Sequence, residues 1–420
     1  MRENPPEAAR PVVLVFPGTY LPGFRAGGPV RSVANMVEAL SEHFQFNIIT
    51  QDNDFGSALP YDDITPDVWT EVGKAQVMYL SRKGRAPYRI WKLISNMSYD
   101  VLYLNSYFEP RFSIFPFLLW RLHLIKRTPV ILAPRGSFSG GALGLKRIKK
   151  WAYIKFSNML NIYNNELVYW QASSEYEKKD IENAFFHAVK ISIAPPVTDR
   201  MPTAKAGAES LPASVARGNA TIFNRPRNAV VKKPGSVSLI FIGRINRMKN
   251  LDFAIRTLVG LHGEVVLDIF GPDEDITYWQ ECKYLIDGLG KNVTINFHYQ
   301  IPHERILVEL STHHFLLLPT LGENFGHVIF ESLVAGCPVI ISDRTPWRGL
   351  IDKGVGWDLP LNDISVFRDV LKKCVDMDEM EYNNLSIQAM QFENSNGISD
   401  LAIKGTLELL KKPLETHPVN

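Results

Sequence analysis

Two glutamates, Glu323 and Glu331, stand eight positions apart in a stretch that is otherwise rich in apolar residues and glycine. The apolar run 315–318 before them predicts a buried parallel strand, followed by a turn and a helix. One carboxylate then belongs to the loop at the carboxyl end of a strand, and the other to the second turn of the next helix. Ligands of open α/β sheets bind at this edge. Such a pair also arises by chance on solvated helix faces, but an acid in apolar surroundings requires a partner.

The segment between the two acids offers a site for an anion. Asn324, Phe325 and Gly326 are expected to open the helix. The first N–H groups of a helix have no partner within it and lie at the positive end of its dipole. This end of the helix therefore suits a phosphate group.

Two cations, Arg244 and Lys249, fall in one loop after the predicted strand 237–242. Fixed cations stabilise a leaving diphosphate more in the transition state than in the ground state, because negative charge builds up on it as its bond breaks. Cations in loops are usually solvated, so the pair is only suggestive by itself. Arg247 lies between them, and we expect it to be exposed.

The N-terminal half holds a second group of candidates. Gly27 and Gly28 precede a predicted helix, and glycine lets backbone N–H groups approach a phosphate, although a plain flexible turn fits equally well. Arg135 follows the predicted strand 129–133. Its guanidinium stays charged, so it could hold a phosphate or a polar sugar group but could not act as a general base. The alternative for Arg135 is a residue of a surface turn.

Strands that alternate with helices predict an α/β protein with two parallel, doubly wound sheets. We expect an N-terminal domain at 1–198, a linker or inserted loop at 199–236 and a C-terminal domain at 237–398. A last helix within 399–415 is expected to pack back on the first domain. The predicted strands are 12–16, 46–50, 100–105, 129–133, 191–197, 237–242, 265–270, 293–297, 315–318 and 339–341.

The stretch 318–341 resembles the signature of family 4 glycosyltransferases, the retaining nucleotide-sugar enzymes with the GT-B fold. Residues 342–350 and 354–362 look like further blocks of that family. The likeness runs from about residue 12 to about residue 410, and it is greatest to bacterial members that build surface polysaccharides. It implies two Rossmann-like domains facing a central cleft, with the donor held mainly by the C-terminal domain.

The resemblance also implies roles for the candidate residues. Glu331 would hydrogen-bond the donor ribose, and Glu323 would bind hydroxyls of the transferred sugar. Arg244 and Lys249 would hold the diphosphate, helped by the N–H groups of 324–326. The segment 27–33 is similar to the family's first loop, which faces the cleft. Many members carry a histidine where this chain has Arg135, which leaves the acceptor's base open.

Asp273 and Asp275 follow the predicted strand 265–270 and could be an acid pair for a metal, or a turn and a helix N-cap. The resemblance favours the second reading, because GT-B enzymes need no divalent metal. We therefore expect neither a metal nor a cofactor, only a nucleotide-sugar co-substrate. His298 could line the base pocket or be a satisfied core histidine, and we favour the core position.

Bulk composition excludes some classes of protein. The net charge of +2 and an isoelectric point near 8.2 do not suggest a nucleic-acid binder. The three cysteines show neither metal spacing nor a disulfide framework, and the first ten residues do not resemble a signal peptide, so we expect a cytoplasmic protein. The most apolar region, 112–125, is shorter than the roughly 20 residues that a membrane span needs. It is either a core helix or, with Lys126 and Arg127 next to it, an interfacial helix.

The run 145–155 holds five cations and no acid and has the spacing of a helix with one apolar stripe. It is either a solvated face or a basic helix that docks on anionic lipid. Docking would suit a lipid-linked acceptor and would make the protein peripheral on the inner face of the cytoplasmic membrane.

The expected function is therefore transfer of a sugar from a nucleotide diphosphate to a glycan or a lipid-linked glycan. One rival is a catalytically silent, sugar-nucleotide-binding subunit, which should lack one of the four charged residues at 244, 249, 323 and 331; all are present. Another is a nicotinamide-dependent dehydrogenase, which should carry Gly-x-Gly-x-x-Gly after its first strand. Neither 12–16 nor 237–242 is followed by that motif.

Overall fold

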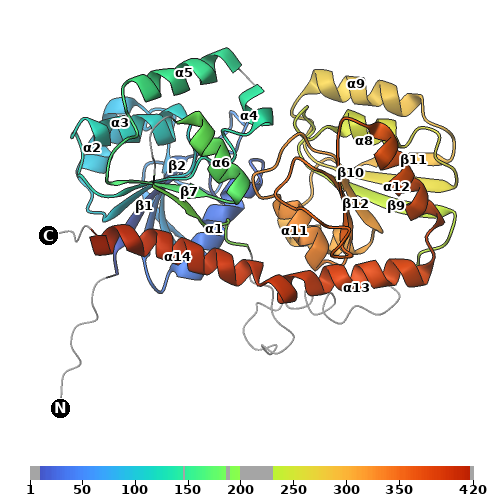
Figure 1. The fold of residues 1–420 in the computed structure, drawn as a ribbon. Helices are drawn as coiled ribbons and strands as arrows, with labels where there is room; N and C mark the ends of the chain where they lie inside the picture. The colour runs from blue at the N-terminus through green and yellow to red at the C-terminus, as the bar shows by residue number, and fades with distance from the viewer. Residues whose placement is uncertain (1–9, 145–146, 186–189, 199–229, 417–420) are drawn as a thin grey trace. The chain divides into compact units, whose positions relative to one another are not determined.

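The computed structural model of this protein describes residues 10–144, 147–185, 190–198 and 230–416. The chain divides into two compact units, Met1–Asp199 with Ser399–Asn420, and Arg200–Ile398. Each unit is built on its own twisted sheet with helices on both faces (Figure 1). The expected α/β class with two parallel-sheet, Rossmann-like domains is thus confirmed. Most of the expected linker, 199–229, lies outside the described residues.

The sheet of the first unit has the order β3-β4-β2-β1-β5-β6-β7-β8. All neighbours are parallel except β3 and β4, which pair as an antiparallel hairpin. The strands are β1 Val12–Phe16, β2 Gln45–Gln51, β3 Trp69–Val72, β4 Ala75–Leu80, β5 Val101–Leu104, β6 Val130–Leu132, β7 Val168–Ala172 and β8 Lys190–Ile193.

The helices of this unit cover both faces of the sheet. Alternate residues of β1 point to opposite faces, so Leu14 and Phe16 join one core cluster and Val13 and Val15 join the other. The last helix completes the second cluster with its residues Leu409 and Leu410. The helices are α1 Gly28–Leu40, α2 Pro87–Ser95, α3 Phe115–Arg121, α4 Gly140–Gly144, α5 Arg147–Met159, α6 Glu175–Ala184 and α14 Ile398–Thr416, with a π-helical turn at Pro110–Ile114. The expected helix at 112–125 is therefore a π-turn and α3, which ends at Arg121.

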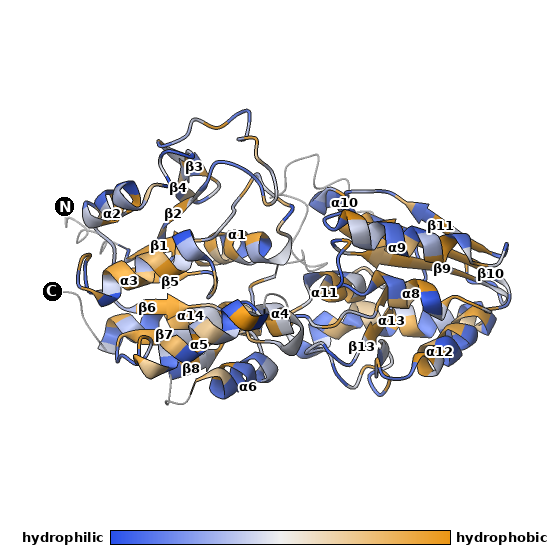
Figure 2. Ribbon diagram, turned by 90° about the horizontal axis from the view of Figure 1, so that it is seen from above, coloured by the Kyte–Doolittle hydropathy of each residue, from blue (hydrophilic) through white to orange (hydrophobic). Residues whose placement is uncertain are grey.

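The sheet of the second unit is fully parallel, in the order β11-β10-β9-β12-β13-β14. Hydrophobic strands fill the middle of the unit, and helices of mixed hydropathy surround them (Figure 2). Its strands are β9 Ser236–Ile242, β10 Glu264–Phe270, β11 Val293–Phe297, β12 Phe315–Leu318, β13 Val339–Ser342 and β14 Gly356–Leu359. Its helices are α8 Leu251–Thr257, α9 Ile276–Asp287, α10 His303–Ser311, α11 His327–Val334, α12 Ile364–Asp376 and α13 Glu379–Asn396.

Each sheet has one point at which the strand order reverses. In the first unit this point lies between β1 and β5, and in the second between β9 and β12. The connections that leave the two central strands run in opposite directions there, which opens a crevice at the carboxyl ends of the strands. The loops after β1, β5, β9 and β12 are therefore the places to look for a site.

Candidate functional site

The loop after β9 carries Lys249, and glycine at position 243 makes room for it. A Cβ on Gly243 would lie 3.3 Å from Cγ of Lys249, closer than nearly all real contacts of this kind. Asn250 ends the loop in a left-handed conformation, with φ at 58°, and its side chain donates to the carbonyl of Pro319 at 2.9 Å. The β9 loop is thus fixed against the loop that follows β12.

A second set of hydrogen bonds holds these two loops together. The carbonyl of Met248 accepts the N–H of Leu321 at 2.8 Å and the hydroxyl of Thr320 at 3.0 Å. The N–H of Glu323 donates to the carbonyl of Arg344 at 3.2 Å. Glu323 is therefore positioned from both sides, by the β9 loop and by the segment after β13.

These contacts place Lys249 beside Glu323. The ammonium group of Lys249 forms an ion pair with Oε1 of Glu323, and the two side chains are only 16% and 12% exposed. The charges are weakly screened because little water reaches them. Two of the residues expected to act on one ligand thus meet at the reversal point of the second sheet.

Arg244 stands in the same loop with a different partner. Its guanidinium donates to Glu274 at 3.2 Å, and the amide of Asn246 donates to the other oxygen of that carboxylate at 2.7 Å. Asn246 also accepts the N–H of Lys249 at 3.3 Å. Arg247, in contrast, is exposed as expected and pairs with Glu281.

The turn before α11 is more tightly built than the sequence suggests. The helix begins at His327, and Gly326 is its N-cap with φ at 82°. A Cβ at Gly326 would lie 2.8 Å from Cδ1 of Ile329, so the tip of that side chain would have to move, and the positive φ itself favours glycine. Phe325 is buried against Trp347, whose indole N–H donates to its carbonyl. Asn324 to Gly326 thus form the turn into the helix, not its first residues.

Glu331 lies in α11 with its side chain mostly buried. Close to it lies His303, the first residue of α10, whose Nδ1 is 3.9 Å from Oε1 of Glu331. Sequence reasoning did not single out His303, Asn246 or Glu274, because their partners are distant in the chain. Only the position of His303 after the β11 strand could have drawn attention to it.

The first unit gathers its candidates at the reversal point between β1 and β5. Gly27, with φ at 67°, is the N-cap of α1, and Gly28 is its first residue. Asn105, directly after β5, donates to the carbonyl of Pro29 at 3.4 Å. Asn105 also accepts the guanidinium of Arg135 at 2.8 Å. The start of α1 and Arg135 are therefore connected through Asn105, which the sequence did not reveal.

Arg135 is held by buried groups and is not a free turn residue. It has a left-handed backbone, with φ at 56°, and its second contact is to the hydroxyl of Tyr103 at 2.7 Å. Next to it, the N–H of Gly136 donates to the buried carboxylate of Glu177, which also accepts both the N–H and the hydroxyl of Ser173. These bonds fix the orientation of the Arg135 side chain.

Of the two acids after β10, Asp275 has an ordinary structural role. Asp275 is the N-cap of α9 and accepts the N–H of Tyr278 at 3.0 Å. Among the described residues, no group of three or more His, Cys, Asp or Glu side chains is placed to hold a metal ion.

His298 differs from the expectation of a core position. Its side chain is 43% exposed, stacks on Phe270 and hydrogen-bonds Asp268. Asp268 also contacts His313 at 3.0 Å. Burial tends to raise the pKa of Asp268, but hydrogen bonds from both histidines outweigh burial and lower that pKa. The imidazole of His298 thus has a hydrogen-bond partner, but it lies at the surface next to the sheet and not in the core.

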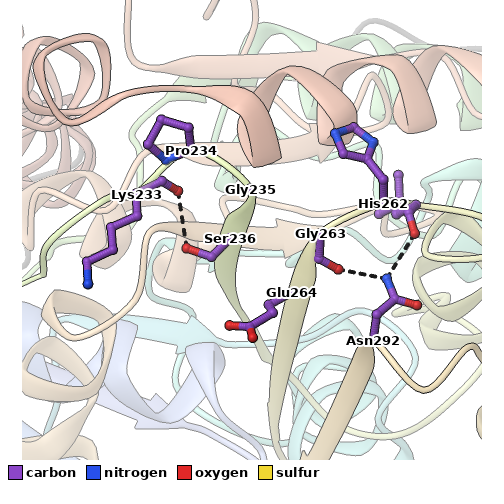
Figure 3. Close-up of a pocket in the computed structure, with 9 residues that line it drawn as sticks. Lys233, Pro234, Gly235, Ser236, His262, Gly263, Glu264 and Asn292 are labelled. Carbon is purple, nitrogen blue, oxygen red and sulfur yellow. Dashed lines mark hydrogen bonds between the residues drawn. The ribbon is translucent and has the colours of Figure 1, made fainter.

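A surface cavity of about 610 Å³ lies in the second unit at the opposite edge of the sheet (Figure 3). Ser236 and Glu264 begin β9 and β10, and Asn292 precedes β11, so the cavity is at the amino ends of the strands. The side-chain amide of Asn292, which lines the cavity, donates to the carbonyls of Leu261 and Gly263. This cavity is therefore separate from the residues at the reversal point.

No described helix is both long and apolar enough to cross a membrane. The basic run begins at 145, but residues 145–146 lie outside the described part of the chain, and α5 begins at Arg147.

Part of the chain matches a known protein family in sequence. Residues 223–391 match the model of the family described as glycosyl transferases group 1. None of the curated proteins matches the chain in sequence.

Solved structures resemble the whole chain. Anabaena HepE, in complex with UDP and glucose, has a TM-score of 0.66 at 13% identity, over 96% of this chain and 99% of that one. Sucrose-phosphate synthase from Thermosynechococcus elongatus has a TM-score of 0.68 at 16% identity, over 97% and 100%. WaaG, a glycosyltransferase involved in lipopolysaccharide biosynthesis, has a TM-score of 0.60 at 14% identity, over 94% and 98%. The chain therefore has the GT-B fold, and its second unit carries the sequence match to group 1 glycosyl transferases.

Proposed function

We propose that this protein is a retaining glycosyltransferase that moves a sugar from a nucleotide-diphosphate-sugar to a glycan or lipid-linked glycan of a surface polysaccharide. The observation that carries the proposal is the Lys249–Glu323 ion pair at the reversal point of the second sheet, inside the segment that matches group 1 glycosyl transferases. The neighbouring fold of HepE, which was solved with UDP and glucose, supports a nucleotide-sugar as donor.

In this proposal the donor's diphosphate binds two cations, Lys249 and Arg244, that form ion pairs with carboxylates in the structure. Lys249 is paired with Glu323, and Arg244 with Glu274. A diphosphate carries more negative charge than one carboxylate and gains more as the bond to the sugar breaks, so both cations favour the transition state. The N-terminus of α11, after Gly326, directly follows the loop that carries Glu323 and adds its dipole. Glu331 binds the donor ribose.

The reaction breaks the bond between the anomeric carbon and the phosphate oxygen, and the diphosphate leaves with the electron pair. The acceptor oxygen forms the new bond to that carbon on the same face, so the configuration is retained. Glu323, once released from Lys249, stabilises the positive charge that develops on the sugar ring and binds its hydroxyls.

The acceptor's proton needs a base, and Arg135 cannot be that base because it stays protonated and is bound to Asn105 and Tyr103. We assign the proton to the departing diphosphate. Arg135, Gly27 and Gly28 belong to the first unit, and there they hold polar or phosphate groups of the substrates.

A binding screen against UDP, GDP, ADP and their sugar conjugates, read by thermal shift, tests the donor site. We expect stabilisation by one nucleotide family, and loss of that stabilisation in Lys249→Ala. The matched control is Arg247→Ala, an exposed cation of the same loop. No stabilisation by any nucleotide at millimolar concentration would contradict a donor site of this kind.

Transfer itself is tested with the stabilising donor and an extract of lipid-linked glycans, with the anomeric configuration of the product read by NMR. Activity should persist in excess EDTA, since the proposed charge stabilisation comes from side chains. Inverted product, or activity abolished by EDTA and restored by a divalent ion, would overturn this mechanism. Donor binding without transfer to any acceptor would favour the silent subunit.

A further inference from the structure

Helix α5 exposes several large apolar side chains on one face. Ile148, Trp151 and Met159 are 83%, 61% and 69% exposed. They recur at intervals of three and eight residues, so they share one face of the helix. Phe156 and Leu160 beside this face are also exposed. A surface helix normally turns such residues inward.

The opposite face of α5 is already used for packing. Ile154 belongs to the core cluster of the unit, and the hydroxyl of Tyr153 contacts that of Tyr163 at 2.7 Å. Asn158 donates to the carbonyl of Ala184 at 2.7 Å. The orientation of the helix is therefore fixed, and the exposed apolar face does not result from loose attachment.

The charges of α5 indicate what covers this face. Arg147, Lys149 and Lys155 are exposed, and the helix contains no acidic residue. The ammonium group of Lys155 lies 5.0 Å from the ring centre of Trp151. Trp beside cations is the composition of a helix that lies in the interface of an anionic membrane. A second copy of the same face would bring like charges together.

We propose that α5 docks this protein on a bilayer of anionic lipid, with Ile148, Trp151 and Met159 inserted among the head groups and Arg147, Lys149 and Lys155 against lipid phosphates. A helix of 13 residues extends about 20 Å, long enough to lie in the membrane plane. This docking stands without the proposed sugar transfer, although it would bring the protein to a lipid-linked acceptor.

The experiment is flotation of the full-length protein with two kinds of vesicle, one of phosphatidylcholine alone and one of phosphatidylcholine and phosphatidylglycerol in equal parts. The wild type should float with the anionic vesicles and much less with the neutral ones. Ile148→Ser with Trp151→Ser should weaken binding to anionic vesicles at least about tenfold. Lys149→Glu with Lys155→Glu should weaken it by a similar factor, and added salt should mimic the charge reversal.

Matched controls separate this face from general surface effects. Ile276→Ser with Tyr284→Ser removes two exposed apolar residues of α9, and Lys411→Glu with Lys412→Glu reverses two exposed cations of α14. Both should bind like the wild type, and all four variants should melt as the wild type does, because the changed side chains are exposed.

Flotation that is unchanged in the α5 variants, or equally weakened in the controls, would overturn the proposal. The wild type could instead fail to bind anionic vesicles and form oligomers, which Trp151→Ser converts to monomers. That result would assign the exposed face of α5 to protein contacts. Neither readout uses a sugar donor, so failure of the proposed transfer would leave this test intact.

Discussion

The ion pair of Lys249 with Glu323 raises two questions, how much Glu323 affects nucleotide binding and how much it affects the transfer rate. One substitution can distinguish these effects. Glutamine at 323 keeps the shape and an oxygen that can accept from Lys249, but it removes the negative charge. We expect Glu323→Gln to leave the affinity for the nucleoside diphosphate within about threefold and to lower the transfer rate by roughly 100-fold, since the charge acts on the transition state. Binding is measured by calorimetry and transfer by product formation.

The control for that substitution is Glu274→Gln, which changes the partner of Arg244. Glu274→Gln should change the affinity for the nucleotide more than it changes the transfer rate of the enzyme with donor bound. A transfer rate of Glu323→Gln equal to that of the wild type would remove Glu323 from the chemistry.

Glu331 is predicted to contribute through binding alone. Replacing it by alanine removes an acceptor for two ribose hydroxyls, and charged hydrogen bonds contribute about 1.5–3 kcal/mol each. Glu331→Ala should therefore raise the dissociation constant of the donor at least about tenfold, as measured by calorimetry. Glu304→Ala, at the exposed start of α10, is the control. Equal donor affinity in both variants would place Glu331 outside the site.

Asp180 gives the first unit a predictable response to pH. Burial, together with the charge of Glu177, raises the pKa of Asp180 from 3.8 to about 6. A raised pKa means that the folded state favours the protonated acid. Its contribution to stability is thus fully present below the unfolded pKa and is lost as pH rises through about 6.

Asp180→Asn should therefore raise the melting temperature by about 2 °C near pH 8 and change it little near pH 3, below the unfolded pKa of 3.8, where the wild-type acid is mostly protonated in both states. Melting followed by circular dichroism at the two pH values measures this. Glu182→Gln, exposed on the same helix, should show no such difference. An equal effect of Asp180→Asn at both pH values would contradict the raised pKa.

At the scale of the elements, the loops after β9 and β10 pack closely against each other at Gly243 and Gly271. Gly271 has φ at 156°, and a Cβ there would lie 1.8 Å from the carbonyl oxygen of Gly243. Gly271→Ala must shift the loop that carries Arg244 and Lys249. We expect it to destabilise the second unit by about 3 kcal/mol or more, as for other strained positions.

Gly260→Ala is the matched control, because Gly260 also has a positive φ, at 77°, but its Cβ would meet no atom within 4 Å. It should cost only about 1 kcal/mol. Chemical denaturation with urea measures both. Equal destabilisation by the two substitutions would mean that backbone conformation, and not the contact with Gly243, decides the effect.

The strands show which elements sequence can predict. Strands β1 and β12 have the expected bounds, because a buried parallel strand is apolar at nearly every position. Strand β11 also has the expected bounds, although it lies at the sheet edge and none of its residues is buried. Strand β3, Trp69–Val72, was missed because it lies at the sheet edge and has only partly buried or exposed residues. Strand β4, Ala75–Leu80, is as apolar as the predicted strands, but it was not predicted.

The site residues show where prediction stops. Loops at the carboxyl ends of strands were placed correctly, but the partner of a charge was not. Lys249 and Glu323 are 74 residues apart, and nothing local specifies that they pair. For α5 the apolar stripe was visible, yet its direction depends on the aromatic cluster around Tyr163, which only the fold assembles.

At the scale of the whole molecule, the chain folds into two units with separate cores, and the last helix belongs to the first of them. Leu409 and Leu410 of α14 are buried with residues of β1 and α1, whereas the core of the second unit is formed by residues between 237 and 392. When two units unfold independently, a ligand raises the stability only of the unit that binds it, by an amount that grows with the logarithm of its concentration relative to the dissociation constant. The two units should therefore respond differently to a nucleotide and to a change in α14.

Calorimetry should accordingly resolve two unfolding transitions, of which the stabilising nucleotide raises only that of the second unit. Leu409→Ala should lower the other transition by on the order of 10 °C, because a Leu-to-Ala change in a core costs about 2–5 kcal/mol. Leu401→Ala, an exposed residue of the same helix, should change neither transition. If the nucleotide and Leu409→Ala move one common transition, the units unfold cooperatively, and binding at the second unit then stabilises α14 as well.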